Sequence, residues 1–139
     1  MIRRLLSLVV LAPFVAAAQS APAAAPAPKP EIFFRAPADN ATVSSTFDVV
    51  FGLRNYGVAP AGVNATMTGH FHLVVDMDPP KTGELIPKDA MNLHYGTGAI
   101  ETKVTLPPGK HTLRIVLGDM DHKVIGPDLV SKPITITVR

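Results

Sequence analysis

The folded part of the chain alternates hydrophobic and polar residues with a period of two. Near the start, Phe47, Val49 and Phe51 fall on one face of an extended segment, and Ile136 and Val138 do so near the end. Alternation of this kind is typical of β-strands with one buried face. Proline and glycine occur in the gaps between these segments. No ten-residue window shows the hydrophobic spacing of a helix without containing one of these two residues.

The alternation predicts about seven short strands. We place them near residues 32–35, 47–53, 70–76, 92–95, 99–106, 111–118 and 133–139. Short, regularly spaced strands separated by turn residues favour an all-β, immunoglobulin-like antiparallel β-sandwich. The stretch 77–91, MDPPKTGELIPKDAM, is then a long connection, and a loop of this length is often functional.

The first 30 residues have a different composition. Residues 1–18 combine Arg3 and Arg4, an apolar run and small residues up to Ala18, a pattern that predicts a secretory signal peptide cleaved near residue 18. Residues 19–30 are rich in alanine and proline and suit an extended tether. Residues 31–139 then form a single β-sandwich domain of ordinary size. This organisation predicts a periplasmic or secreted protein.

Charge and composition narrow the classes of partner. The chain has 13 basic and 11 acidic residues, and loss of Arg3 and Arg4 with the signal peptide leaves the mature chain near neutral. No cluster of lysine and arginine remains that could follow a phosphate backbone, so we expect no nucleic acid partner. We also expect no transmembrane segment in the mature chain, because no later apolar run approaches about 20 residues. Cysteine is absent, so a metal site would use histidine, methionine, carboxylates or backbone.

The chain carries none of the common catalytic motifs. It contains no G-x-S-x-G, no H-E-x-x-H and no P-loop sequence, and its carboxylates form no obvious acid–base pair. We therefore expect a protein that is not an enzyme.

The stretch TGHFHLVVD places two histidines at alternate positions of an expected strand. His70 and His72 share one face, while Phe71, Leu73 and Val75 occupy the more apolar face and are expected in the core. The histidines would then lie on the outer face or at the rim. Two imidazoles spaced in this way can bind one metal ion, and two exposed polar residues at a strand end are the alternative.

Other histidines lie near expected strand ends. His94 precedes an aromatic residue and a glycine, and His111 is in phase with the core residues of its strand. If these strand ends meet at one pole of the sandwich, the imidazoles of His70, His72, His94 and His111 converge on one metal ion. Methionines occur two or three residues before His70, His94 and His122, and thioether with imidazole suits copper. Zinc is the other candidate; His122 and Asp119, in the turn GDMDH, rank behind the four histidines as ligands.

Several longer motifs carry a resemblance to a known family. FGLRNYGVAPAG, TGHFHLVVD, LHYGTG, LPPGKHTLRIVLGD and SKPITITV together resemble the bacterial exported family called domain of unknown function 4399. The resemblance implies an exported, largely β domain whose function is not established. His70 and His72 match the outer histidines of the family's G-H-H-H-L pattern, in which Phe71 replaces the middle one, and His94, His111 and His122 match further family histidines.

These observations lead to two hypotheses of function. The first is a periplasmic, non-enzymatic binding module in which His70, His72, His94 and His111 hold copper or zinc. Glu101 or Asp76 would then accept the imidazole N–H bonds and fix the tautomers. The second is a structural or interaction domain of the cell envelope with an envelope protein as partner and no metal site. The physiological ligand and the partner are unknown from the sequence.

Overall fold

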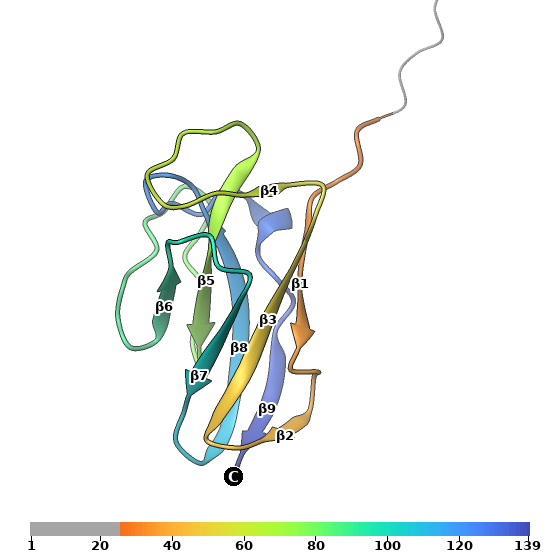
Figure 1. Cartoon of the computed structure of the whole chain (residues 1–139), viewed down its shortest axis with the longest axis vertical. Coiled ribbons are helices and arrows are strands. Elements are labelled where there is room, and N and C mark those ends of the chain that lie inside the picture. The colour runs from red at the N-terminus through yellow and green to blue at the C-terminus, as the bar shows by residue number, and fades with distance from the viewer. Residues whose placement is uncertain (1–25) are drawn as a thin grey trace, which may run out of the picture.

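The computed structural model describes residues 26–139, and nearly all of their regular structure is β (Figure 1). The strands are β1 (Glu31–Ala36), β2 (Ala41–Val43), β3 (Thr46–Arg54), β4 (Gly57–Val58), β5 (Thr68–Val75), β6 (Asn92–Tyr95), β7 (Glu101–Thr105), β8 (Gly109–Gly118) and β9 (Ile134–Val138). A short 3-10 helix, η1, covers Pro127–Leu129. The strands form a three-stranded sheet in the order β1-β3-β7 and a six-stranded sheet in the order β2-β9-β8-β5-β4, with β6 also paired to β5.

The β-sandwich class predicted from alternation is confirmed, and each expected strand is present with ends shifted by at most two residues. The sequence pattern missed β2 and β4, which have only three and two residues and are too short to show a period. The expected signal peptide, residues 1–18, lies outside the described residues, as does most of the tether of residues 19–30. No helix in residues 26–139 is long and apolar enough to cross a membrane.

The main core lies between the two sheets. Phe51 from β3 stacks on Phe71 from β5, with ring centres 4.6 Å apart and planes inclined by 22°. Leu73, Leu113 and Ile115 continue this layer and are fully buried. Aromatic pairs at such distances add to the free energy gained from apolar burial, so this contact fixes the phase of β5 relative to the other sheet.

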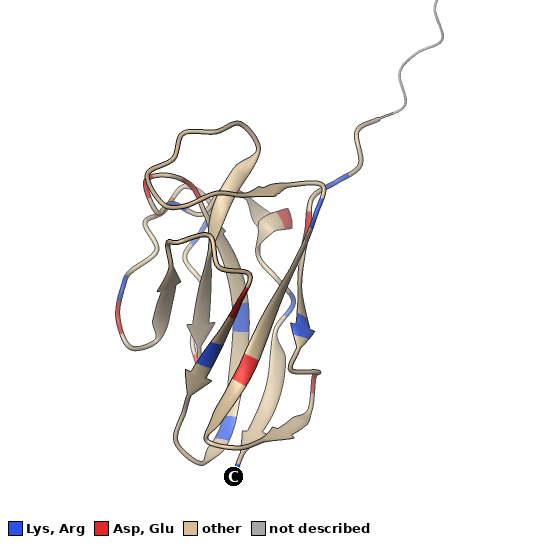
Figure 2. Ribbon diagram, viewed as in Figure 1, with Lys and Arg blue, Asp and Glu red and all other residues tan. Residues whose placement is uncertain are grey.

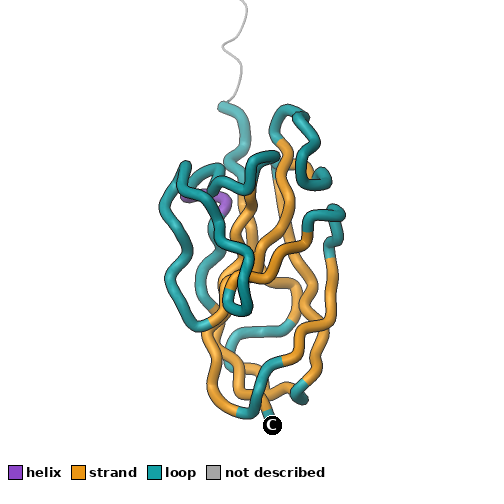
Figure 3. Tube along the Cα trace, turned by 90° about the vertical axis from the view of Figure 1, so that its left-hand side faces the viewer, coloured by secondary structure: helices purple, strands orange, loops and turns teal. Residues whose placement is uncertain are grey.

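The opposite face of β5 and β8 is also buried. The chain between β5 and β6 places Ile86 there, and the chain after β8 adds Val124, which pack with Val74 and Val116 in a second hydrophobic cluster. Backbone bonds join the two covering segments, from the N–H of Ile86 to the carbonyl of His122 (2.8 Å) and from the N–H of Val124 to the carbonyl of Glu84 (3.0 Å). Figure 3 shows loop tubes lying alongside the strands in the half of the molecule away from the C-terminus.

Charged residues of both signs are interspersed along the strands (Figure 2). Lys103 of β7 pairs with Asp48 directly opposite on β3 at 2.7 Å. Arg54 of β3 likewise reaches Glu31 on β1 at 2.6 Å. Both pairs are exposed, so each contributes at most about 1 kcal/mol and mainly favours the observed strand register.

His111 sits at the start of β8 and joins three parts of the chain. Its Nδ1 lies 2.7 Å from Oδ2 of Asp76, the residue after β5, and its Nε2 lies 2.9 Å from the carbonyl oxygen of Pro107. Both partners are acceptors, so both ring nitrogens must donate and the imidazole is favoured in its charged form. The hydrogen bond to Asp76 is the main reason why the pKa of His111 is raised above its usual value.

This arrangement predicts a stability that declines on the alkaline side. Because the pKa of His111 is higher in the folded chain, its contribution is complete below about pH 6.5 and is lost as pH rises through the raised pKa. Chemical denaturation between pH 6 and 9 should therefore show a steeper loss of unfolding free energy for the native protein than for His111→Gln. An equal change of unfolding free energy with pH in the two proteins would contradict a protonated His111 bonded to Asp76.

Candidate metal centre

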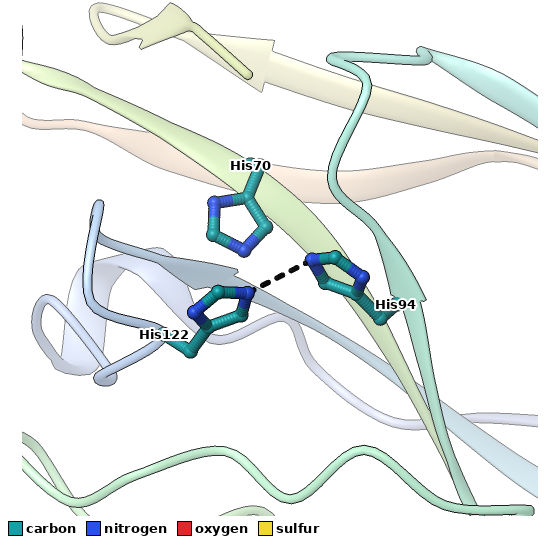
Figure 4. A group of neighbouring side chains, drawn as sticks. All are labelled: His70, His94 and His122. Carbon is teal, nitrogen blue, oxygen red and sulfur yellow. Dashed lines mark hydrogen bonds between the residues drawn. The ribbon is translucent and has the colours of Figure 1, made fainter. Parts of the chain in front are cut away.

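Four histidines from three segments meet beside the six-stranded sheet. His70 and His72 come from β5, His94 from β6 and His122 from the turn after β8. Nε2 of His72 lies 2.9 Å from Nε2 of His70, and Nε2 of His122 lies 3.1 Å from Nε2 of His94. Figure 4 shows the rings of His70, His94 and His122 turned toward one another. We call these four residues the imidazole cluster.

Strand pairing positions three of the four rings. His70 and His72 project from the same face of β5, opposite Phe71, as the alternation predicts. His94 is the direct antiparallel partner of His72, and His70 pairs with Gly118 at the end of β8. Phe71 is held in the main core by its stack on Phe51, so the two histidines on its flanks must face the second cluster.

The turn after β8 supplies the fourth ring. Oδ1 of Asp119 accepts the backbone N–H of Asp121 at 2.9 Å and of Lys123 at 2.8 Å, and the N–H of His122 bonds the Asp119 carbonyl at 3.0 Å. Aspartate commonly shapes turns in this way. His122 itself has φ of 64°, which is uncommon for a residue with a side chain and directs its ring back over β5.

Two glycines make room for the rings. A Cβ atom on Gly118 would stand 2.9 Å from Nε2 of His72, and one on Gly96 would stand 2.6 Å from Nε2 of His94. Neither glycine has a positive φ that alanine would avoid, so the requirement for glycine at both positions is steric.

The four rings lie close to the corners of a tetrahedron. The distances between ring centres are 4.8 Å for His70–His72, 5.0 Å for His70–His94, 4.8 Å for His70–His122, 5.0 Å for His72–His94, 5.8 Å for His72–His122 and 4.8 Å for His94–His122. The centre of a tetrahedron with edges of about 5 Å is about 3.1 Å from each corner, and an imidazole nitrogen is about 1.1 Å from its ring centre. A ring that points one nitrogen at the centre would thus place it about 2.0 Å from an ion there, the length of a Zn–N bond.

Ring nitrogens of His70, His94 and His122 all lie within 4.8 Å of one another, which is close enough for one ion. His72 is the most distant of the four from His122, yet its Nε2 is in contact with Nε2 of His70. Ligand nitrogens around a tetrahedral ion with bonds of about 2.05 Å stand about 3.3 Å apart. The two close pairs would therefore open by a few tenths of an ångström to admit it.

Burial keeps the imidazoles of His70, His72 and His94 neutral. His70 and His72 are 1% and 0% exposed, and His94 is partly buried. Burial first, and then the neighbouring His122 and His94, lower the pKa of His70 to about 4. Burial and then His70 lower the pKa of His72 to about 3. Burial also lowers the pKa of His94. These rings are therefore neutral at pH 7, the form that a metal ion requires.

The structure brings together three of the four predicted histidines, His70, His72 and His94, but not His111. His111 pairs with Ile136, seven residues along β8 from Gly118, so it lies about 23 Å from the imidazole cluster along the strand. It also shares the phase of Leu113 and Ile115, on the main-core side of the sheet. His122, which the sequence placed in a lower rank, takes its place.

The expected partners of the imidazoles also lie elsewhere. Asp76 bonds His111, and Glu101 is exposed at the start of β7 in the other sheet. Asp119 shapes the turn through its Oδ1, and its negative charge acts on His70. Among residues 26–139, Nδ1 of His70 and Nδ1 of His72 have no hydrogen-bond partner.

Two further expectations need correction. His70 and His72 are not on an outer face or rim, because Ile86 and Val124 cover that side of the sheet. Methionine is not part of the cluster that the structure brings together. The side chains of Met67, Met77, Met91 and Met120 are each at least 38% exposed, and Sδ of Met77 accepts a hydrogen bond from Asn92 at 3.5 Å. The donor set supported by the geometry is therefore nitrogen alone.

Comparison with known protein families identifies the family of this chain. The family model described as "Domain of unknown function (DUF4399)" matches residues 49–139, well over half of the chain. The chain belongs to the DUF4399 family. The resemblance seen in the sequence motifs is thus confirmed, and the whole imidazole cluster lies within the matched residues. No curated protein and no solved structure matches the chain. The DUF4399 match does not include β1 and β2. It does include β5, β6 and the turn after β8, which carry the four histidines.

The lowered pKa values predict that the metal-free DUF4399 domain loses stability in acid. His70 and His72 take up protons near pH 6.5 when unfolded but only near pH 4 and pH 3 when folded, so the unfolded state gains protons first as pH falls. The unfolding free energy should drop by a few kcal/mol between pH 6.5 and 4 in the presence of a chelator. His72→Leu should make this slope shallower, whatever its stability at pH 7, whereas His111→Gln should not. An unchanged slope in His72→Leu would contradict the buried neutral imidazole.

Proposed function

We propose that this protein is an exported, non-enzymatic metal-binding module whose ligands are His70, His72, His94 and His122. The observation that carries the proposal is the near-tetrahedral arrangement of four imidazoles, whose ring centres lie 4.8 to 5.8 Å apart and whose Nε2 atoms face each other in two close pairs. A nitrogen-only set of four imidazoles suits copper or zinc rather than magnesium or calcium, which take oxygen ligands. The signal-like residues 1–18 support export to the periplasm.

The alternative of an envelope interaction domain does not explain this cluster. Burial and the neighbouring imidazoles lower the pKa of His70 and of His72, and Nε2 faces Nε2 in the two close pairs. Such groups cost free energy in a domain that uses them only as packing. A bound ion makes the grouping favourable, because coordinate bonds to the ring nitrogens offset the cost of removing these polar groups from water.

The direct test is a titration of the tag-free protein, in its exported form, with Zn(II) and with Cu(I) under reductant. We expect one ion per chain with a dissociation constant in the micromolar range or below, about −8 kcal/mol or better. Substituting Gln for His70, His72, His94 or His122 should weaken binding by about 100-fold or more.

His111→Gln is the matched control, because it removes the remaining histidine of the chain without touching the cluster. It should bind the ion as the native protein does. Binding no tighter than about 1 mM for both ions would overturn the proposal. An equal loss of affinity in His111→Gln would also overturn it.

A second test leaves all the ligands in place. Gly118→Ala should push the ring of His72 from its position, because the new methyl group would meet its Nε2 at 2.9 Å. Gly126→Ala is the control, since nothing lies within 4 Å of a Cβ at that position. We expect Gly118→Ala to lower the metal affinity at least about 10-fold, as loss of ligand orientation does in other sites, and Gly126→Ala to leave it unchanged. Equal metal affinities in Gly118→Ala and Gly126→Ala would contradict the position of the His72 ring beside Gly118.

A further inference from the structure

The charge of a bound ion would be poorly balanced at the imidazole cluster. All four ligands are neutral, so the ion keeps its full charge in a place where His70 and His72 are almost completely buried. Asp119 is the carboxylate whose charge acts on His70, and its Oδ1 is already occupied by two backbone N–H groups. The cost of burying an ion rises steeply with its charge. The cluster therefore favours an ion of low charge.

The geometry points in the same direction. Cu(II) prefers a tetragonal arrangement with four donors near one plane. In that arrangement two pairs of opposite ring centres would stand about 6.3 Å apart for bonds of about 2.05 Å. Only His72–His122 approaches this, at 5.8 Å, and the other five distances are 5.0 Å or less. The direct strand pairing of His72 with His94 holds these two rings 5.0 Å apart, too close to be opposite ligands in one plane.

The missing hydrogen bonds to Nδ1 add a third reason. Imidazole ligands commonly donate their second N–H to a carboxylate, which makes the ligand more basic and helps to hold a divalent ion. Nδ1 of His70 and Nδ1 of His72 have no such partner among the described residues, and Asp76 and Glu101 lie elsewhere. Ligands without this support stabilise a singly charged ion better than a doubly charged one.

From these three observations we propose that the imidazole cluster is a copper site that binds Cu(I) more tightly than Cu(II). The inference rests on the proposed metal-binding function and names the oxidation state that the site holds. Cu(I) has a filled d shell and no preference for a plane, so it accepts four nitrogens near the corners of a tetrahedron. Cu(II) would meet the same ligands with twice the charge and in an unsuitable geometry.

The test measures both affinities on the same protein. Cu(I) is titrated without oxygen in ascorbate against a Cu(I)-specific chelator, and Cu(II) is titrated without reductant against an amino-acid chelator. We expect a dissociation constant for Cu(I) at least about 100-fold below that for Cu(II), which places the potential of the bound couple about 120 mV above that of the aqueous couple. Direct electrochemistry of the copper-loaded protein gives an independent value of that potential.

Two variants separate this inference from the general proposal. Asp119→Asn keeps the oxygen that accepts the turn N–H bonds and removes the negative charge. Because the energy of two charges is proportional to each, it should weaken Cu(II) about twice as much as Cu(I) on a logarithmic scale. His72→Gln opens one ligand position to water and should reduce the difference between the affinities for Cu(I) and Cu(II). His111→Gln should leave it unchanged.

The outcomes are distinct. Equal or tighter binding of Cu(II) in the native protein overturns the Cu(I) preference but leaves the metal site intact. Equal losses for the two ions in Asp119→Asn overturn the charge argument. Failure to bind Cu(I), Cu(II) and Zn(II) more tightly than about 1 mM overturns both this inference and the proposed function.

Discussion

The burial of β5 on both faces is the constraint on which the rest of the structure depends. On one face Phe71 stacks on Phe51 and joins the two sheets. Because alternate residues of a strand point to opposite faces, His70 and His72 then lie on the other face, which Ile86 and Val124 cover. A strand with polar residues on its covered face must satisfy them there, because a buried polar group without a partner costs free energy. β6 and the turn after β8 bring His94 and His122 to these two rings, while Nδ1 of His70 and Nδ1 of His72 have no hydrogen-bond partner among the described residues.

The two ends of β8 illustrate how the surroundings decide what a histidine does. At the start of the strand, His111 faces two oxygen acceptors and is stabilised as a cation. Beyond the end of β8, His122 faces the imidazole of His94, and both of these rings lower the pKa of His70. The same type of side chain thus joins two oxygen acceptors as a cation in one place and lies among other imidazoles in the other.

The sequence predicted local order well and contacts between distant segments less well. Alternation located the main strands and placed His70 and His72 opposite Phe71, because a period of two is a property of the strand itself. It could not show that the loop containing Ile86 folds back over that face, since the loop has no period. It also could not distinguish His111 from His122. Membership of the cluster depends on which end of β8 is near His70 and on the turn set by Asp119, and both depend on tertiary pairing.

The most direct test of the central claim is X-ray absorption at the metal edge of the zinc-loaded protein. The imidazole cluster predicts four nitrogen ligands at about 2.0 Å, with the outer-shell scattering of four imidazole rings and no sulfur. A spectrum showing two or fewer imidazoles, or a shell dominated by oxygen or sulfur, would contradict the claim that these four histidines form one metal site.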